Sequence, residues 1–209
     1  MKAEKTIFLV RHGTTAYNEA DLLQGQIDNP LNDRGVEECR LLCQELKDKP
    51  IDIVFHSPLQ RARQTAEILN GTHLAKYVCI DCFKEIDLGE WEGHEFARVI
   101  KENRDFYQQW QADPSVAIPG GESFLQVFQR VKPGVDVIMD SPHRNIVIVG
   151  HATVNRGILA HLLNLTPAAA RLFRMRNASY SKLLVYQNPR SRYTVVESWN
   201  NAFHLKGLK

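Results

Sequence analysis

The sequence predicts an α/β fold, a three-layer α/β/α sandwich with a mostly parallel central sheet. Two continuous apolar runs of strand length, residues 6–10 and 145–149, are rich in β-branched side chains. Such runs are typical of central parallel strands that are covered on both faces. Segments with helical spacing of apolar residues lie between the predicted strands, and this alternation favours helices packed on a parallel sheet.

Shorter patterns predict the other elements. A short β-branched run indicates a strand, whereas apolar side chains three and four residues apart indicate one face of a helix. In chain order these patterns predict a helix from Asp33 with Leu41, Leu42 and Leu46 on one face, a strand over residues 51–55, a helix over 59–69 with Ala62, Ala66 and Leu69 on one face, a strand over 78–80, and helices over 123–131 and 154–163.

The last part of the chain contains an expected helix break and an expected hairpin. Pro133 and Gly134 should break or kink the helix that precedes them, because proline removes a backbone donor and clashes with the preceding turn. Residues 181–185 and 194–198 are predicted as a late hairpin or a pair of edge strands, since the Asn-Pro-Arg-Ser segment between them is a turn signal.

Composition and charge limit the class of protein. The 209 residues are 44% hydrophobic and 24% charged, and they contain no repeat or linker-like segment, so we expect one globular domain over residues 1–209. A formal net charge of +2 without a dense Lys/Arg block gives no reason to expect nucleic acid or a membrane as partner. The apolar run over residues 7–10 is too short for a signal peptide or a membrane span, so we expect a cytoplasmic protein.

The four cysteines are expected to be reduced thiols. Cys39, Cys43, Cys79 and Cys82 are too few for a disulfide-built secreted domain of this length. Cys79 and Cys82 have C-x-x-C spacing, which leaves a zinc or redox site as an alternative. The other pair lacks the two-residue spacing of structural zinc sites, so we expect no metal and no cofactor.

Reactive side chains follow three of the predicted strands. Arg11 and His12 follow the first strand, Arg61 comes shortly after the second, and His151 follows the strand over residues 145–149. In open α/β sheets, ligands bind outside the carboxyl ends of the strands. If two of these strands are neighbours, the two histidines approach each other at the rim of the sheet, with both arginines close by.

Such a cluster of cations points to an anion. Burying several cations together without a counter-charge costs several kcal/mol per ion, so the cluster is best explained by a dianion such as phosphate. Arginine also recognises phosphate oxygens in a bidentate manner. The alternative is that Arg11 and Arg61 form ion pairs elsewhere, for which Asp28, Asp33 and Glu67 are available.

Four blocks of sequence carry a family resemblance. They are Leu9-Val10-Arg11-His12-Gly13-Thr14-Thr15 with Asn18, Leu23-Gln24-Gly25, Asp28, Pro30-Leu31 and Arg34-Gly35; Ser57-Pro58-Leu59-Gln60-Arg61-Ala62 with Thr65-Ala66; Glu85-Ile86 with Gly89 and Trp91-Glu92-Gly93; and Val149-Gly150-His151. In content and order they resemble the histidine phosphatase superfamily, the phosphoglycerate-mutase-like proteins. A looser likeness extends over residues 177–180 and 200–205. Thr14 departs from the pattern, since many members carry glutamate there, and this leaves the substrate preference open.

The resemblance implies the catalytic roles. His12 would be the nucleophile that becomes phosphohistidine, and Glu85 would be the general acid and then the general base. Arg11, Arg61 and His151 would bind the phosphoryl oxygens and stabilise the transition state. An imidazole with an unperturbed pKa of about 6.5 is largely neutral at pH 7 and can offer a lone pair to phosphorus, and the neighbouring arginine should help to keep it neutral. A phosphate dianion beside the glutamate would favour the protonated acid that the first step needs.

Four further residues are expected to bind phosphate or substrate. The resemblance implies that Asn18 adds a donor and that Gln24 faces the phosphate or the attacking water. Thr15 and Ala152, which adjoin the first and last blocks, complete the expected set.

The family contains phosphatases and mutases, and the chain favours a phosphatase. Mutase members usually carry longer insertions between the acid and the second histidine than this chain has. We therefore predict a metal-independent hydrolase of a small phosphomonoester, with a homodimer left open. Candidate substrates are phosphoserine, α-ribazole phosphate or a broad range of phosphomonoesters, because residues 110–122 resemble a region of the phosphatases for the first two and the tail with Asn200 and His204 is similar to the phosphoserine phosphatases.

Two other functions stay open, as does the role of four aromatic residues. The first is a cofactor-dependent phosphoglycerate mutase, primed by a bisphosphorylated glycerate. The second is a non-catalytic phospho-ligand-binding protein, although such a protein would be expected to lack the nucleophile or an arginine.

Four aromatic residues have two possible roles. They either form the wall of a leaving-group pocket or belong to the core, and they are Phe83, Trp91, Phe106 and Trp110.

Overall fold

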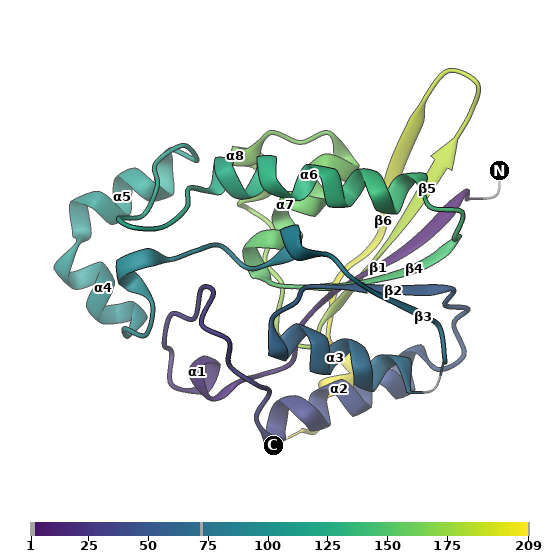
Figure 1. The fold of residues 1–209 in the computed structure, drawn as a ribbon, viewed down its shortest axis with the longest axis horizontal. Coiled ribbons are helices and arrows are strands. Elements are labelled where there is room, and N and C mark those ends of the chain that lie inside the picture. Colours follow the sequence, from purple (N-terminus) through teal and green to yellow (C-terminus); the bar gives the residue numbers. More distant parts are fainter. Residues whose placement is uncertain (1–2, 72, 209) are drawn as a thin grey trace.

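The computed structural model describes residues 3–71 and 73–208 of the chain. In this part, six strands form one sheet with the order β3-β2-β4-β1-β5-β6 (Figure 1). In chain order the strands are β1 (Lys5–Arg11), β2 (Ile53–His56), β3 (Lys76–Cys79), β4 (Asn145–Gly150), β5 (Tyr180–Gln187) and β6 (Arg192–Asn201). β3, β2, β4 and β1 are parallel, whereas β5 is antiparallel to both β1 and β6. The predicted mostly parallel sheet and the predicted late hairpin are confirmed.

β4 and β1 are the two middle strands of the sheet, and both of their faces are buried. Successive side chains of a strand point to opposite faces of the sheet. Ile7 and Leu9 of β1 therefore pack in one hydrophobic cluster, whereas Phe8 and Val10 pack in the other. β4 divides its apolar residues between the same two clusters in the same way. This explains why these strands are continuous apolar runs in the sequence.

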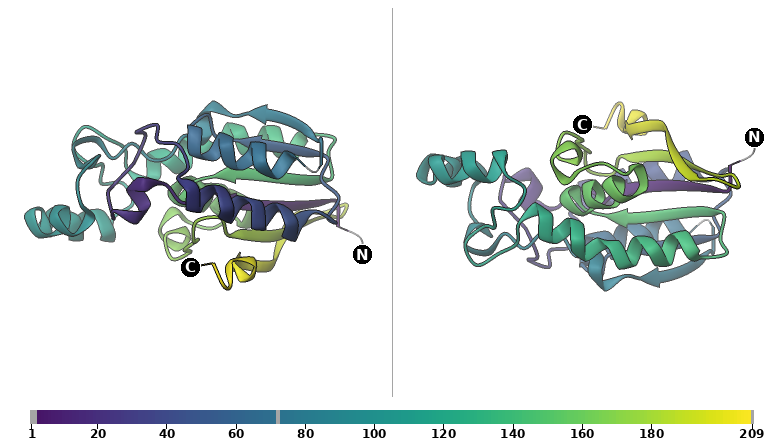
Figure 2. Two further views of the ribbon diagram at one scale, coloured as in Figure 1. Left: turned by 90° about the horizontal axis from the view of Figure 1, so that it is seen from below. Right: turned by 90° about the horizontal axis from the view of Figure 1, so that it is seen from above.

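Helices cover both faces of the sheet. α2 (Asp33–Leu46) and α3 (Gln60–Asn70) lie on one face, and α6 (Phe124–Asp140) and α7 (Ala152–Leu163) lie on the other (Figures 1 and 2). The predicted three-layer α/β/α sandwich is confirmed. The shorter elements are α1 (Ala16–Glu19), α4 (Phe96–Glu102), α5 (Arg104–Ala112), α8 (Pro167–Ala170) and the 3-10 turns η1 (Asp81–Phe83), η2 (Gly89–Trp91) and η3 (Phe203–Leu205). No helix of the described residues is long and apolar enough to cross a membrane.

The expected break at Pro133 and Gly134 is wrong, since α6 continues through both to Asp140. Pro133 lies on the exposed side of the helix, where water can hydrate the carbonyl that loses its backbone bond. Gly134 is buried, and a Cβ there would lie 2.6 Å from a ring carbon of the core. Val131 before the proline and Ile138 after it are both buried, so packing on both sides keeps the helix continuous.

Element boundaries also differ from the predicted ones. β2 begins at Ile53 instead of residue 51, because the preceding Asp52 accepts hydrogen bonds from the backbone N–H groups of residues 144 and 145 at the start of β4. β3 occupies residues 76–79 instead of 78–80. In α2, Leu41 is only half-buried, and the buried face is formed by Gly35, Glu38, Cys39, Leu42, Cys43 and Leu46.

α4 and α5, which were not predicted, extend the molecule beyond the carboxyl ends of the parallel strands (Figure 1). The Trp91 ring packs against Phe106 and Trp110, with centroid distances of 5.8 and 5.7 Å. These aromatic residues attach α5 to the sandwich. Phe83 is fully buried in the core, so its interpretation as a wall of a leaving-group pocket is wrong.

Candidate active site

The structure brings His12 and His151 together at the carboxyl end of the sheet. β1 and β4 are neighbours, Arg11 pairs with Gly150 in their register, and the backbone N–H of His12 donates to the carbonyl of Gly150 at 3.1 Å. The two histidines therefore leave adjacent strands at the same level. Their ring centroids are 5.1 Å apart and both rings are buried.

Arg61 and Arg11 complete the cluster with their guanidinium groups held by backbone carbonyls. Arg61, in the first turn of α3, is 1% exposed and donates through its two Nη atoms to the carbonyls of Gly25 and Ile27, both at 2.8 Å. Arg11 donates through Nη1 to the carbonyl of Met175 at 2.7 Å. Carbonyl oxygens orient a guanidinium but leave its charge without a counter-ion, so both arginines can still bind an anion.

The alternative that these arginines are used in ion pairs is wrong for the described residues, where neither lies within 4 Å of a carboxylate oxygen. Asp28 instead accepts hydrogen bonds from Gln60, and Glu67 lies 3.9 Å from Arg63. The Nε atoms of Arg11 and Arg61 are buried and have no hydrogen-bond partner in this part of the chain. Neither guanidinium is therefore neutralised by a contact ion pair within the described residues.

Burial and positive charge keep both imidazoles neutral. Burial, followed by the charges of Arg61 and Arg11, lowers the pKa of His12 well below its ordinary value. Burial, followed by Arg61, His12 and Arg11, does the same to the pKa of His151. Burial also lowers the pKa of Arg61 to about 10, although the carboxylate of Glu85 opposes this change. At pH 7 the site therefore contains two neutral rings beside two cations.

The hydrogen bonds of His12 determine which ring nitrogen is available. Nδ1 lies 2.7 Å from the carbonyl of Gly13, and because a carbonyl can only accept, Nδ1 carries the proton. The lone pair of the neutral ring is then on Nε2. Gly13 cannot be larger, since a Cβ would lie 2.6 Å from the carbonyl of Gly35 and 2.7 Å from the sulfur of Cys39. Its N–H also donates to Thr65 Oγ1 at 3.1 Å, which fixes the loop that holds the nucleophile.

Glu85 lies at the N-terminus of α7. Its carboxylate accepts backbone N–H groups from Thr153 at 3.1 and 3.2 Å, from Val154 at 3.2 Å and from Ile86 at 2.9 Å. The N–H groups of Thr153 and Val154 belong to the first turn of α7 and have no partner within the helix, so they fix the position of the carboxyl group. The residue is 9% exposed, and its charge acts on Arg61 and Arg11. The acid is therefore part of the same cluster as the two histidines.

Arg130 of α6 fixes the loop that carries Glu85. Its guanidinium donates to the carbonyls of Cys82, Lys84 and Glu85 at 2.7, 2.9 and 3.3 Å. The same group forms a two-pronged ion pair with Glu122, at 2.8 Å on each side. The loop from residue 82 to residue 85 is thus attached to α6 by one side chain.

Three of the four predicted substrate-binding residues form one network after β1. Thr15 is fully buried, caps α1 and donates through Oγ1 to Gln24 Oε1 at 2.9 Å. Asn18 accepts at Oδ1 from the N–H of Thr15 at 3.2 Å and from Asn177 Nδ2 at 3.0 Å. Ala152, the first residue of α7, is half-buried directly after His151.

Thr14, the residue that departs from the family pattern, is directed towards α2. Its N–H and its hydroxyl both donate to the carboxylate of Glu38, each at 2.9 Å. A buried pair of hydrogen bonds therefore takes up this side chain.

Three residues of the site were not predicted from the sequence. Ser57 Oγ is hydrogen-bonded to His151 Nε2 at 2.7 Å, and His151 Nδ1 is buried with no partner among the residues that the structure describes. Asn177 Nδ2 donates to the carbonyls of His12 and Gly13 at 3.1 and 3.3 Å. Ser57 directly follows β2, so the strand-end argument could have found it. The third residue, Arg156 of α7, has no comparable signal.

The thiols and the metal-binding residue types do not form a second centre. Within residues 3–71 and 73–208, no group of three or more His, Cys, Asp or Glu side chains could hold a metal ion. Cys39 and Cys43 are buried, Cys82 is half-buried and Cys79 is exposed, and no disulfide joins them. Burial raises the pKa of Cys39 to about 12 and also raises those of Cys79 and Cys82, which makes these thiols less reactive at neutral pH.

The buried imidazoles predict that the protein loses stability in acid. The pKa values of His12 and His151 are lowered in the folded state and return to about 6.5 on unfolding, so the unfolded chain binds more protons below that pH. The stabilisation is fully present above about pH 6.5. Below it, the free energy of unfolding should fall by up to about 1.4 kcal/mol per pH unit for each imidazole. Urea unfolding between about pH 7.5 and about pH 5 measures this slope. The His151→Asn variant should have a shallower slope, and an unchanged slope would contradict the assignment.

Comparisons with known proteins agree on one family. The model of the histidine phosphatase superfamily (branch 1) matches residues 7–202. Phosphoserine phosphatase 1 of Hydrogenobacter thermophilus is 31% identical over 202 residues, which cover 95% of this chain and 93% of that protein. A protein of Yersinia enterocolitica named "Probable phosphoglycerate mutase" is 30% identical, with 95% and 94% covered.

Solved structures resemble most of the chain. The mycobacterial glucosyl-3-phosphoglycerate phosphatase has a TM-score of 0.83 and 29% identity, with 94% of this chain and 98% of that chain covered. The α-ribazole phosphatase of Shigella flexneri has a TM-score of 0.81 and 28% identity, with 94% and 96% covered.

Proposed function

The chain belongs to the histidine phosphatase superfamily, branch 1, and we propose that it is a phosphatase that hydrolyses a small phosphomonoester through a phosphohistidine on His12. One observation carries the proposal. A buried neutral imidazole, whose Nδ1 is bound by the Gly13 carbonyl, lies beside Arg11 and Arg61, whose charges have no carboxylate partner in the described part of the chain. A phosphoryl dianion supplies both a counter-charge for the two guanidinium groups and the electrophile.

In the first step, the lone pair on His12 Nε2 attacks phosphorus as the bond from phosphorus to the leaving oxygen breaks. Arg11, Arg61 and His151 bind the equatorial oxygens, whose charge must be neutralised in a phosphoryl-transfer transition state. If the hydroxyl of Ser57 donates to His151 Nε2, the neutral ring of His151 carries its proton on Nδ1 and can donate it to a phosphoryl oxygen. Glu85 gives a proton to the leaving oxygen, which departs as an alcohol.

In the second step, water takes the place of the alcohol. Glu85, now a carboxylate, accepts a proton from the water. The oxygen of the water attacks phosphorus as the bond from phosphorus to His12 Nε2 breaks. The products are inorganic phosphate and the original neutral imidazole. One carboxyl group thus acts as acid and then as base, which suits its fixed position at the N-terminus of α7.

Asn18, Gln24, Thr15 and Ala152 are proposed to line the phosphate end of the site. The Oδ1 atom of Asn18 is used within the protein, so its amide nitrogen is the group that it can offer to a phosphate oxygen. The two arginines provide the positive charge and the neutral ring of His151 provides a hydrogen-bond donor, so the proposed reaction uses no metal ion and no cofactor. We propose that residues 1–209 form one domain that acts in the cytoplasm, alone or as a homodimer, without nucleic acid or membrane partners.

The names of the relatives support hydrolysis more than isomerisation. The solved structures include phosphatases for glucosyl-3-phosphoglycerate and α-ribazole phosphate, and the curated relatives include a phosphoserine phosphatase. Several curated relatives from Yersinia instead carry the name "Probable phosphoglycerate mutase". Phosphoserine and α-ribazole phosphate stay the candidate substrates, together with other small phosphomonoesters. A mutase instead would transfer the phosphoryl group back to a second hydroxyl and would need a bisphosphorylated primer.

A phosphatase assay in chelator tests the proposal. The purified protein is incubated in EDTA with an aryl phosphate, phosphoserine, α-ribazole phosphate and 3-phosphoglycerate, and released phosphate is measured. We expect phosphate release without any primer from the aryl phosphate and from at least one of the metabolites. Isomerisation of 3-phosphoglycerate that requires a bisphosphoglycerate primer, with no net release of phosphate, would support the mutase instead. Release that disappears in EDTA would contradict the metal-free reaction.

A further inference from the structure

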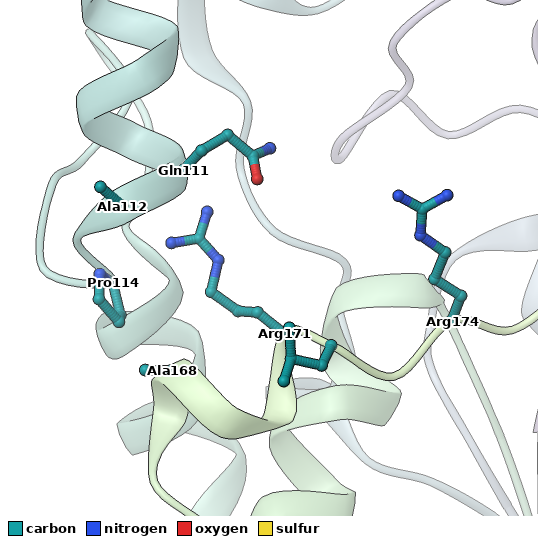
Figure 3. A pocket seen from close by; sticks show the side chains of 7 residues that line it. Gln111, Ala112, Pro114, Ala168, Arg171 and Arg174 are labelled. Atoms are coloured by element: carbon teal, nitrogen blue, oxygen red, sulfur yellow. The ribbon is translucent and has the colours of Figure 1, made fainter.

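A pocket lies between the end of α5 and the segment that follows α8. It has a volume of about 280 Å³, and its lining includes Gln111, Pro114, Arg171, Leu172 and Arg174. Figure 3 shows the guanidinium groups of Arg171 and Arg174 directed to the same side of this hollow, with the Gln111 amide between them. Its polar groups are thus mainly cationic donors.

Arg171 is held in place by aromatic rings. Its guanidinium carbon lies 4.9 Å from the centroid of the Trp110 ring and 5.9 Å from that of Phe124. Such contacts fix a cation without neutralising it. Its Nη1 atom is buried and has no hydrogen-bond partner in the described chain. Asp113 is the carboxylate whose charge reaches this arginine, but the two form no ion pair, and Asp113 instead accepts from the N–H and hydroxyl of Ser115.

The chain connects this pocket directly to the catalytic cluster. Two residues after Arg171, the carbonyl of Phe173 accepts from Arg156 Nε at 2.7 Å. Two residues further on, the carbonyl of Met175 accepts from Arg11 Nη1 at 2.7 Å. Within five residues, the backbone therefore passes from the pocket to the arginine beside the nucleophile.

Arg156 of α7 interacts with both the pocket and the catalytic cluster. It is one helical turn after Thr153, whose N–H binds Glu85, and residues three apart in a helix lie on the same side. Its pKa is lowered by burial, raised by Glu85 and lowered again by Arg171 and Arg174, so its charge interacts with both the acid and the pocket. None of the three arginines is ion-paired within residues 3–71 and 73–208.

The number of positive charges exceeds what one phosphoryl group can balance. Arg11 and Arg61 match a phosphate dianion, and Glu85 must be protonated for the first proposed step. Arg171 and Arg174 of the pocket then remain without a carboxylate partner, and so does Arg156, whose charge interacts with both of them. Placing partly buried cations close together costs free energy that an anion offsets, and guanidinium groups bind carboxylate and phosphate through paired donors.

We propose that Arg156, Arg171 and Arg174 form a subsite for a second anionic group, a carboxylate or a second phosphate, carried by the leaving group of the substrate. This inference rests on the proposed function and narrows it to acidic phosphomonoesters. Gln111 supplies a further polar contact at the edge of the subsite, and α5 forms one of its walls. Esters with neutral or cationic leaving groups are poor substrates, because they bring no negative charge to these three arginines.

Matched pairs of esters test the subsite. The pair 3-phosphoglycerate and glycerol 3-phosphate differs by a carboxylate, as does the pair phosphoserine and phosphoethanolamine. The bisphosphate and the monophosphate of propane-1,3-diol differ by a second phosphate. We expect kcat/KM to be at least about tenfold higher for the acidic member of a pair, about the effect of one charge-assisted contact. The pair with the larger ratio identifies the anion as carboxylate or phosphate.

The ratio of kcat/KM between the acidic ester and its partner should fall about tenfold in Arg171→Gln and in Arg174→Gln. The reason is that each variant lowers kcat/KM for the acidic ester only. Arg174 is exposed, so its replacement tests the subsite even if Arg171→Gln disturbs the packing on Trp110. Arg190→Gln, at an exposed arginine of the β5–β6 turn, is the matched control and should keep the ratio of the parent protein.

Three other outcomes would overturn either the subsite or the proposed function. A parent protein that hydrolyses both members of every pair equally well would overturn the subsite but not the phosphatase. A clear preference that neither variant alters would assign the anion to other residues and also overturn the subsite. An absence of hydrolysis with every ester and with the aryl phosphate would instead overturn the proposed function on which the subsite rests.

Discussion

Replacing His12 by alanine should reduce phosphate release from an aryl phosphate by at least about a thousandfold, or roughly 4 kcal/mol of activation free energy. The reason is chemical, since the variant has no lone pair to form the covalent intermediate and no neighbouring group can take its place. The ring of His151 is only 5.1 Å away, but its Nε2 is already hydrogen-bonded to Ser57. Initial rates of the purified variant in EDTA measure the loss.

The control is His161→Ala, which removes an imidazole from α7 where it stacks on Phe128, away from the catalytic cluster. This variant should keep a rate close to that of the parent protein. Brief reaction with radiolabelled phosphoester, followed by an alkaline quench, should label the parent but not His12→Ala, because a phosphoramidate survives alkali. His12→Gln is a second variant in case the alanine form melts early. A rate near that of the parent in a folded His12 variant would exclude the phosphohistidine.

The central sheet was predictable because burial on both faces leaves a direct trace in the sequence. Strands β1 and β4 have to be apolar at consecutive positions, since Ile7 and Phe8 enter different clusters on opposite sides of the sheet. The same physics placed the reactive residues. A polar residue directly after such a strand lies at the rim, where His12 and His151 meet.

Elements stabilised by distant contacts were less predictable. Within α5 no residue is fully buried, and its attachment depends on Trp91 from another segment. The continuation of α6 through Pro133 depends on which side of the helix faces water. Propensity describes the isolated segment, whereas these outcomes depend on packing against partners far along the chain.

The same limit applies to the site. Arg156 lies outside the blocks of the family pattern, and its importance comes from the carbonyl of Phe173 and from the charges around it. Asn177 reaches His12 only because β5 lies beside β1. The strand ends and the family blocks predicted His12, His151, Arg61 and Glu85, but not the side chains outside these blocks that packing brings beside them.

Glu85→Gln should lower kcat about 10²- to 10⁴-fold for an ester with an alcohol leaving group, the usual contribution of a general acid and base. A glutamine keeps one carbonyl oxygen to accept the N–H groups of Thr153 and Val154, so binding of substrate should weaken much less than turnover. The two proposed steps can be separated by the choice of substrate. An aryl phosphate releases a stabilised phenolate that needs no proton, so the first step should stay fast while attack by water becomes slow.

Rapid mixing of Glu85→Gln with the aryl phosphate should therefore give a burst of phenolate close to one equivalent of enzyme, followed by slow turnover. With the alcohol ester, no burst of product should appear, because the first step is then limiting. Glu90→Gln makes the same chemical change at an exposed position of the nearby 3-10 turn η2 and should turn over both esters like the parent protein. Unaltered turnover of the alcohol ester by Glu85→Gln would remove this residue from proton transfer. A large loss without a burst would restrict its role to the first step or to binding, and would leave the base for the attacking water to be found among the other residues of the cluster.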